Sequence, residues 1–314
     1  MPELLLGALV VDALVGDPRW LFRRIGHPVT WMGRLIEIAD RRLNRPGLTP
    51  AALRLRGGLV LLGLAGTCGL IAWAIGSVLG TIPFGWIGEI LVVATLLAGR
   101  GLYDHVQAVR VALTADGLES ARHAVAKIVG RDVSELDLAG VCRAAIESLA
   151  ESFSDGVVGP ALAYLAFGLP GIAAYKAVST ADSMIGNRDE RYRSFGWAAA
   201  RTDDLFNLVP ARLTTLLIAL AAGRDAGLAL ATAWRDARRH ASPNAGWPEA
   251  AMAGALGLRL GGPRRYDGLE LDGAWLGRGR PDAGPDDIGR GLRLYSVAMG
   301  FIAGMLALAA LALN

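Results

Sequence analysis

Residues 57–88 read GGLVLLGLAGTCGLIAWAIGSVLGTIPFGWIG and carry no charged side chain. A helix crosses a bilayer with about 20 apolar residues, so this run is too long for one straight span. Its second half contains the sequence TIPFG at 81–85, where proline and glycine mark a turn. The stretch therefore predicts a helical hairpin in a membrane (57–100), with a second arm that reaches Arg100.

Three further apolar windows lie outside this hairpin. Residues 294–314 are uncharged throughout and predict a C-terminal membrane helix. The window 156–178 is interrupted in its middle by a Gly-Leu-Pro-Gly sequence, which leaves two halves that are each too short to cross. It is either re-entrant or crosses the membrane together with 205–222. Residues 205–222 are apolar except for Arg212. We therefore treat 156–222 as one membrane and signature-loop region.

The composition agrees with a membrane protein. Hydrophobic side chains make up 53% and charged side chains 19% of the 314 residues, and the mean hydropathy is +0.38. These values exclude a disordered or fibrous chain. A net charge of +3 is too small to indicate a nucleic-acid-binding protein. Two cysteines cannot build a disulfide framework or a zinc site.

The basic residues predict an orientation. Nine arginines and three acidic residues lie between Asp17 and Arg56, whereas the hairpin turn is uncharged. By the positive-inside rule, the first loop is cytoplasmic. The chain returns to that side over 101–155, a segment that we expect to be helical because apolar residues recur at helical spacing among charges. Residues 224–293 are expected to form a cytoplasmic loop segment.

These patterns predict an all-α, polytopic integral membrane protein. We expect about four to six membrane helices, including a re-entrant helical hairpin, together with cytoplasmic helical segments. The chain 1–314 is expected to form a single domain embedded in the lipid bilayer of the inner (plasma) membrane.

The first dense patch of polar residues follows Cys142. Arg143, Glu147 and Glu151 are spaced i, i+4, i+8, which places them on one face of a helix, and Asp155 follows. Three carboxylates that converge at a membrane entry suit Mg²⁺, which takes carboxylates together with waters and substrate phosphates. From spacing alone, a pair of i, i+4 salt bridges on a solvated face is the simpler interpretation.

The second patch runs from Tyr175 to Asp204 and is rich in both signs of charge. Arginine forks match phosphate and carboxylate groups, and an isolated lysine at the end of an apolar window suits a phosphate as a point charge. The alternative is an ordinary juxtamembrane loop whose lysine extends toward the water. The residues that we single out are Lys176, Asp182, Arg188, Arg191, Arg201, Asp203 and Asp204.

Two other segments are weaker candidates. Asp17 and His27 lie among glycines and prolines, where a capped first loop explains them as well as a ligand site does. Residues 242–249 (SPNAGWPE) hold Ser242 and Asn244 among turn formers, and a plain loop is the simplest interpretation. The sequence contains no Walker A, GxSxG or HExxH pattern.

Five sequence blocks occur in a fixed order along the chain. They are DALVGDP at 12–18 with HPV at 27–29, RAAIESLAE at 143–151, SDG at 154–156, YKA at 175–177 with DSM at 182–184, and SPNAG at 242–246. Their order, spacing and density resemble the signature blocks of the CobD/CbiB family of cobalamin-biosynthesis membrane proteins, the adenosylcobinamide-phosphate synthases. The resemblance runs from about residue 9 to residue 268.

The resemblance implies a carbon–nitrogen (acid–amine) ligase that depends on ATP and Mg²⁺. Such an enzyme joins the carboxylate of a corrinoid, adenosylcobyric acid, to 1-amino-2-propanol or its phosphate, aminopropanol phosphate. Phosphoryl transfer from ATP makes the carboxylate oxygen a leaving group, and this transfer depends mostly on metal positioning and charge stabilisation. ATP and cobyric acid are cytoplasmic, so the resemblance also implies an active site that faces the cytoplasm.

This reaction suggests a role for each singled-out residue. Mg²⁺ ligands are expected among Glu147, Glu151, Asp155, Asp203 and Asp204. Substrate and phosphate binding is expected from Arg143, Lys176, Arg188, Arg191, Ser242 and Asn244. Catalytic roles are expected for Asp182, as the general base for the attacking ammonium, and for Lys176 and Arg201.

Two functions from other classes stay open on the sequence alone. One is a membrane transporter or carrier for a corrinoid or another anion, which predicts ionisable residues near the middle of the bilayer in paired broken helices. The other is a non-catalytic regulatory membrane protein, which needs no dense acidic and basic blocks. The sequence leaves open a homo-oligomer and the choice between free and phosphorylated aminopropanol.

Overall fold

The computed structural model describes residues 1–130, 132–186, 189–266, 269–271 and 273–313. Helices make up most of these residues, and the strands found among them are two or three residues long. They pair as β1 (Leu260–Gly261) with β4 (Trp275–Leu276) and as β2 (Arg264–Tyr266) with β3 (Leu269–Leu271), both antiparallel. The predicted all-α fold is confirmed.

Four helical stretches of the described chain are long and apolar enough to cross a membrane, or five if Trp197–Phe206 and Leu208–Ala221 count as one broken span. The four are Pro50–Leu79, Gly85–Ala115, Leu138–Ile185 and Pro285–Leu313. The polytopic membrane prediction, with four to six membrane helices, is therefore confirmed.

The chain forms two compact units. Unit 1 comprises Met1–Ala98, Gly159–Asn207 and Leu306–Asn314, and unit 2 comprises Gly99–Val158 and Leu208–Met305. The helices of unit 1 are α1 (Pro2–Val15), α2 (Arg19–Ile25), α3 (Pro28–Leu43), α4 (Pro50–Leu79), α5 (Gly85–Leu96), α9 (Gly159–Ile185) and α10 (Trp197–Phe206). A single membrane-embedded domain stays a prediction.

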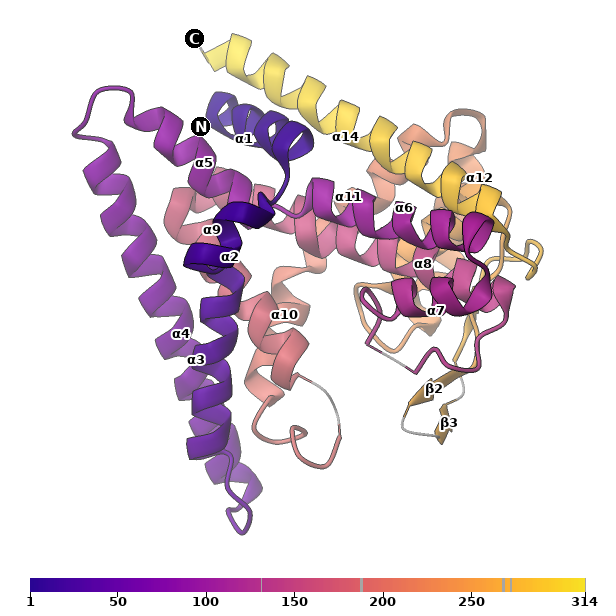
Figure 1. The fold of residues 1–314 in the computed structure, drawn as a ribbon, viewed down its shortest axis with the longest axis horizontal. Helices are drawn as coiled ribbons and strands as arrows, with labels where there is room; N and C mark the ends of the chain where they lie inside the picture. Colours follow the sequence, from indigo (N-terminus) through magenta and orange to yellow (C-terminus); the bar gives the residue numbers. More distant parts are fainter. Residues whose placement is uncertain (131, 187–188, 267–268, 272, 314) are drawn as a thin grey trace. The chain divides into compact units, whose positions relative to one another are not determined.

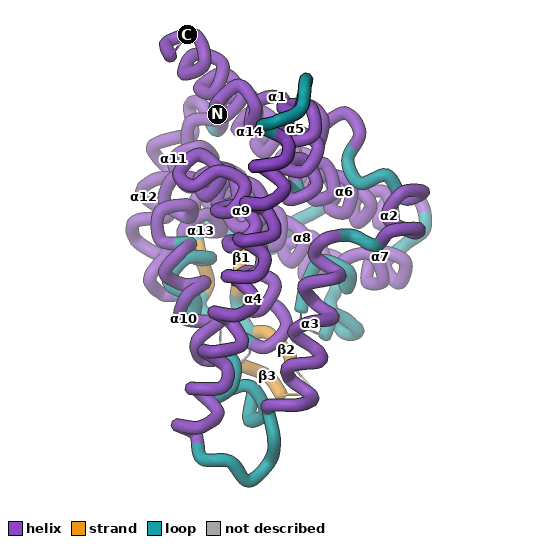
Figure 2. The backbone as a smooth tube through the Cα atoms, turned by 90° about the vertical axis from the view of Figure 1, so that its left-hand side faces the viewer, coloured by secondary structure: helices purple, strands orange, loops and turns teal. Residues whose placement is uncertain are grey.

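The uncharged stretch at 57–88 forms the predicted hairpin between α4 and α5. Phe84 in the turn adopts a left-handed conformation with φ of 60°. A Cβ atom on Gly85 would lie 1.8 Å from the carbonyl oxygen of Leu79, so this turn requires glycine. Figures 1 and 2 show α3 beside the half of α4 that lies away from the hairpin turn, and α4 also packs along α9.

The core of unit 1 lies where α3, α4, α9 and the start of α10 meet. Met32 and Ile36 of α3, Leu61 and Leu64 of α4 and Phe195 before α10 are buried together. Inside a membrane such side chains stabilise the fold mainly by close van der Waals packing between the helices. This core holds the C-terminal half of α9 against α10, which is where the second charged patch lies.

Gly57 allows α4 to approach the chain that precedes α10. A Cβ atom on Gly57 would lie 1.8 Å from the carbonyl oxygen of Phe195, so alanine there would force the two segments apart. We expect Gly57→Ala to destabilise the protein by about 1–3 kcal/mol, measured as a lower apparent Tm in detergent. Gly63→Ala is the control, because a Cβ there meets nothing within 4 Å and alanine favours helix. Equal Tm values for the two variants would contradict this packing.

The Gly-Leu-Pro-Gly interruption produces a kink in α9. Gly168 adopts φ of 63° and ψ of −153°, which no helix residue has, and Pro170 follows. The helix nevertheless resumes and continues to Ile185. The expected break is therefore present, and α9 consists of two helical halves that meet at a kink at Gly168. The re-entrant path through the membrane stays a prediction.

Unit 2 is also helical. Its helices are α6 (Gly99–Ala115), α7 (Leu118–Val125), α8 (Leu138–Phe153), the π-helical turn η1 (Ser154–Val158), α11 (Leu208–Ala221), α12 (Ala226–Asp236), α13 (Gly246–Leu256) and α14 (Pro285–Leu313) as far as Met305, with the short 3₁₀ turns η2 (Gly223–Asp225) and η3 (Ala237–Arg239). The expected helical segment at 101–155 is present as α6, α7 and α8.

The expected loop segment at 224–293 is wrong for about a third of its length, because α12 and α13, of 11 residues each, lie within it. Both helices are rich in alanine and glycine, and small side chains let two helices approach closely. A Cβ atom on Gly254 of α13 would lie 2.7 Å from the carbonyl oxygen of Leu228 in α12. The turn formers at 242–245 and the flanking arginines made the half-exposed α12 and the buried α13 look like loop in the sequence.

Asp236 anchors the end of α12. It is 2% exposed and accepts hydrogen bonds from Arg235 Nε and Nη2, at 2.9 and 2.6 Å, and from the Gly277 N–H, at 2.9 Å. The Arg235 guanidinium holds the pKa of Asp236 below its usual range, although burial opposes this effect. A lowered folded pKa means that ionised Asp236 stabilises the fold above the unfolded pKa of about 3.9, and that this contribution is lost as the pH falls further.

We therefore expect Asp236→Asn to destabilise the protein by about 1–3 kcal/mol at neutral pH, because amide hydrogens would face these donors. The difference in apparent Tm between the variant and the wild type should shrink as the pH falls below about 4. Thermal denaturation at a series of pH values measures it. A Tm difference that grows with acidification would contradict the assignment.

Candidate functional site

The second charged patch lies on α9 and α10 of unit 1. Lys176 and Asp182 belong to α9, and α10 packs against this helix. Gly196, just before α10, permits the approach, because a Cβ atom there would lie 1.5 Å from the carbonyl oxygen of Ile185. Asp182 is close enough to Asp204 of α10 for the two carboxylates to repel each other. The structure thus brings together acids from both ends of the predicted patch.

A buried hydrogen-bond chain fixes Asp203. The Tyr175 hydroxyl donates to Asn207 Oδ1 at 2.6 Å, and Asn207 Nδ2 donates to Asp203 Oδ2 at 2.9 Å. Asn207 is fully buried, and Gly159 leaves the space for the Tyr175 ring, since a Cβ there would lie 2.1 Å from the hydroxyl. Asn207 was not predicted as a site residue, although it is a polar residue within the otherwise apolar stretch LFNLVP at 205–210.

The arginines of this patch have defined partners. Arg201 Nη1 lies 3.1 Å from Asp204 Oδ2 on the same helix. Arg191 Nη2 lies 2.5 Å from Asp40 Oδ2 of α3, and the buried Asp40 also accepts from the Tyr192 hydroxyl at 3.3 Å. Arg191 therefore neutralises a buried carboxylate, in addition to any contact with phosphate. Arg188 lies outside the described residues.

The first patch lies on α8 and η1 of unit 2, and much of it faces the protein. Arg143 Nη1 donates to the carbonyl oxygen of Pro281 at 2.5 Å, and its guanidinium lies 5.5 Å from the Trp275 ring centre. Glu147 is 5% exposed, and its Oε1 accepts from the Gly261 N–H at 2.7 Å. The interpretation of this patch as a solvated face is wrong at Glu147. Glu151 is exposed and Asp155 half-buried.

Ser242 and Asn244 position the start of α13. Ser242 Oγ accepts from the N–H groups of Asn244 and Ala245, both at 3.2 Å. Asn244 Oδ1 accepts from Arg212 Nη1 at 2.7 Å, and the Arg212 guanidinium stacks 4.8 Å from the Trp247 ring centre. The segment is therefore an ordered turn that leads into α13, rather than a plain loop. Asn244 also gives a hydrogen-bond partner to Arg212, the arginine within the apolar window 205–222.

The acidic side chains that the structure describes do not form a cluster of metal ligands. Within the described ranges, no three His, Cys, Asp or Glu side chains are gathered closely enough to hold a metal ion. Glu147, Glu151 and Asp155 are spread along α8 and η1, because eight residues of helix span about 12 Å. Mg²⁺ needs only one or two carboxylates when waters and substrate phosphates complete its octahedron. The carboxylates of α10 fit that requirement.

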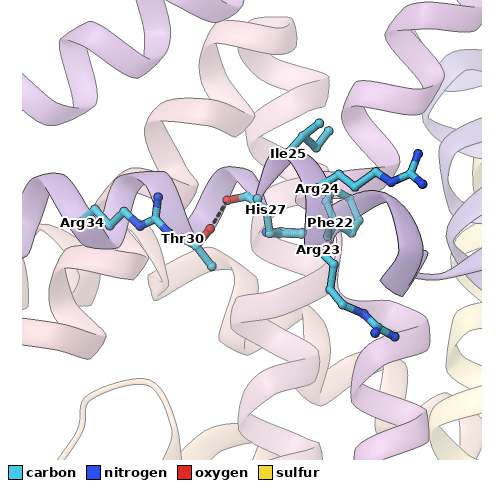
Figure 3. Close-up of a pocket in the computed structure, with 8 residues that line it drawn as sticks. Phe22, Arg23, Arg24, Ile25, His27, Thr30 and Arg34 are labelled. Carbon is cyan, nitrogen blue, oxygen red and sulfur yellow. Dashed lines mark hydrogen bonds between the residues drawn. The ribbon is translucent and has the colours of Figure 1, made fainter.

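The first sequence block forms a capped turn. Val29 N–H donates to His27 Nδ1 at 3.2 Å at the start of α3, and His27 Nε2 lies 3.5 Å from Asp17 Oδ1. A cavity of about 610 Å³ adjoins this turn. Figure 3 shows that Arg23 and Arg24 lie at one end of this cavity and Arg34 lies at the other end. The capped loop expected as one alternative is present, beside a basic cavity.

Comparisons with known proteins give one consistent result. The model of the CobD/Cbib protein family matches residues 5–295. The chain is 52% identical over 295 residues to "Cobalamin biosynthesis protein CobD" of Rhodobacter capsulatus, covering 93% of this chain and 92% of the relative. It is 49% identical over 313 residues to the Brucella suis protein of the same name, with coverages of 97% and 95%. The Rhizobium meliloti protein of that name is 47% identical over 319 residues, with coverages of 99% and 97%. No solved structure matches the chain.

Proposed function

The chain belongs to the CobD/Cbib protein family, whose members named above are cobalamin-biosynthesis proteins, and from this membership we propose that it forms an amide bond in that pathway. The reaction is the ATP-dependent joining of adenosylcobyric acid to 1-amino-2-propanol or its phosphate, which gives adenosylcobinamide or adenosylcobinamide phosphate. The family match over residues 5–295 carries this proposal.

The chemistry requires activation of the corrinoid carboxylate. The γ-phosphoryl group of ATP passes to a carboxylate oxygen and ADP leaves. The amine nitrogen then attacks the acyl carbon, the C–N bond forms, inorganic phosphate leaves, and a base removes the ammonium proton. Phosphoryl transfer depends on positioning and on stabilising negative charge. A site for this reaction needs cations, a metal-binding carboxylate and a separate base.

The α9–α10 cluster of unit 1 supplies these groups. Lys176 and Arg201 bind phosphate oxygens, and Asp182 takes the proton from the attacking amine. Asp203, oriented by Asn207, and Asp204 are the metal-binding carboxylates. When bound there, Mg²⁺ would neutralise charge on the phosphates of ATP.

The signature residues of unit 2 serve the substrates. We assign Arg143, Ser242 and Asn244 to substrate binding, and Glu147, Glu151 and Asp155 each singly as a carboxylate that contacts a metal ion or a substrate. Arg188 and Arg191 are assigned to phosphate. Each of these assignments is tested by substitution once turnover has been measured. The active site faces the cytoplasm, where ATP is found, in a protein of the inner membrane.

The deciding experiment is a mass-spectrometric assay with detergent-solubilised protein. Adenosylcobyric acid, aminopropanol phosphate, Mg²⁺ and ATP are supplied together, and each is then omitted in turn. We expect an amide product that requires ATP and metal, with ADP formed in equal amount. Corrinoid binding without product would favour a carrier or a subunit of a larger enzyme, and no corrinoid binding would overturn the proposal.

A further inference from the structure

A second cavity, of about 460 Å³, lies in unit 2 between α6 and the first half of α14. None of its lining residues belongs to the sequence blocks of the proposed active site. Its lining is rich in hydrogen-bond donors and positive charge, which come from Arg110, Arg290, Arg293, Tyr103, Gln107 and Ser296. Asp286 is the acidic residue among the described lining residues.

Two of the three arginines, Arg110 and Arg293, are not neutralised by a close acidic partner among the described residues. A Cβ atom on Gly289 would lie 3.0 Å from Cζ of Arg110, so glycine lets that guanidinium rest against α14. Its partner Asp286 is fully exposed and 3.9 Å away, a geometry that contributes little in water. Arg290 is held by Asp287 at 3.0 Å, whereas Arg293 has no hydrogen bond or ion pair with the residues that the structure describes.

The cavity lies where α14 turns from charged to apolar. Arg293 is the last charged residue of the helix, and residues 294–313 are uncharged. Val297, Phe301 and Met305 follow Arg293 at i+4 intervals, so each neighbours the one before it and the row winds slowly around the helix. They are 47%, 41% and 49% exposed. An exposed apolar stripe therefore begins next to the basic cavity.

We propose that this cavity binds the headgroup of an anionic phospholipid. The lipid phosphate is bound by Arg110 and Arg293, with the hydroxyl and amide groups of the lining beside it, and an acyl chain lies along the stripe from Val297 to Met305. Basic pockets beside membrane helices bind anionic headgroups, and guanidinium groups match phosphate oxygens with two parallel hydrogen bonds. A soluble phosphate would use the arginines and leave the apolar stripe uncovered.

Native mass spectrometry of the full-length protein in detergent tests this proposal. The protein is titrated with phosphatidylglycerol and with phosphatidylcholine of identical acyl chains. We expect tighter binding of phosphatidylglycerol. Arg110→Gln and Arg293→Gln should each weaken it about fivefold without changing phosphatidylcholine binding. Arg293→Lys should keep most of the preference, and Arg278→Gln, which removes an exposed arginine elsewhere in unit 2, should keep all of it.

Three results would overturn the proposal. One is equal binding of the two lipids, and another is unchanged phosphatidylglycerol binding by both glutamine variants. The third is displacement of the lipid by millimolar inorganic phosphate, which would make the cavity a site for a soluble anion. Phe301→Ser should weaken both lipids alike and leave their ratio unchanged, because it alters only the acyl-chain contact. This experiment measures lipid binding directly, so its result does not depend on the turnover of the proposed amide-forming reaction.

Discussion

Asp182→Asn is expected to lower the turnover of the amide-forming reaction by about 10²- to 10⁴-fold, the range typical of a lost general base. The asparagine amide has nearly the same shape as the carboxylate but cannot accept the ammonium proton. Its neutral side chain also relieves the repulsion from Asp204, so we expect no loss of thermal stability. Product formation measured by mass spectrometry, together with the apparent Tm, checks both statements.

Asp116→Asn is the matched control for this substitution, because it makes the same chemical change elsewhere in the chain. Asp116 follows α6, is exposed, and lies outside the sequence blocks. Its replacement should leave turnover within about twofold of the wild type. If Asp182→Asn retained the turnover of this control, the base would have to be sought among the other carboxylates of the chain.

The membrane hairpin was predictable from sequence because its determinants are local. A charge-free run and a Pro-Gly turn lie within 57–88, and both act over short distances along the chain. The helices α12 and α13 were missed for the opposite reason. Their burial depends on close contact between two alanine- and glycine-rich helices, such as Gly254 with Leu228, and composition alone does not distinguish this pattern from a flexible loop.

The residue types of the candidate site could be predicted from the sequence, but the partners of its side chains could not. The residue types of the second patch indicated phosphate chemistry, and their proximity in sequence placed them in one region. The partner of Arg191 is Asp40, 151 residues away, and that of Glu147 is the backbone of Gly261, 114 residues away. Such long-range pairs carry no local signal, so spacing alone could not show that these side chains also hold the fold together.

The structural contact of Glu147 can be separated experimentally from its proposed role in the reaction. Its buried carboxylate accepts a hydrogen bond from the Gly261 N–H at 2.7 Å, and this contact joins α8 to β1. The proposed function adds a role in which the negative charge of the same side chain serves the metal or its ligands. Glutamine keeps an acceptor oxygen at nearly the same place and removes the charge. Alanine removes both.

We expect Glu147→Ala to lose stability, by about 1–3 kcal/mol, because it leaves a buried N–H group without an acceptor. Glu147→Gln should keep an apparent Tm close to that of the wild type but lower turnover by at least about 100-fold, because the charge is needed in the reaction. Titration of Mg²⁺ in the assay supplies an independent readout, since loss of a metal carboxylate raises the concentration needed for half-maximal rate. Wild-type turnover in Glu147→Gln would restrict Glu147 to holding α8 against β1, and the metal would then depend on Asp203 and Asp204 of α10.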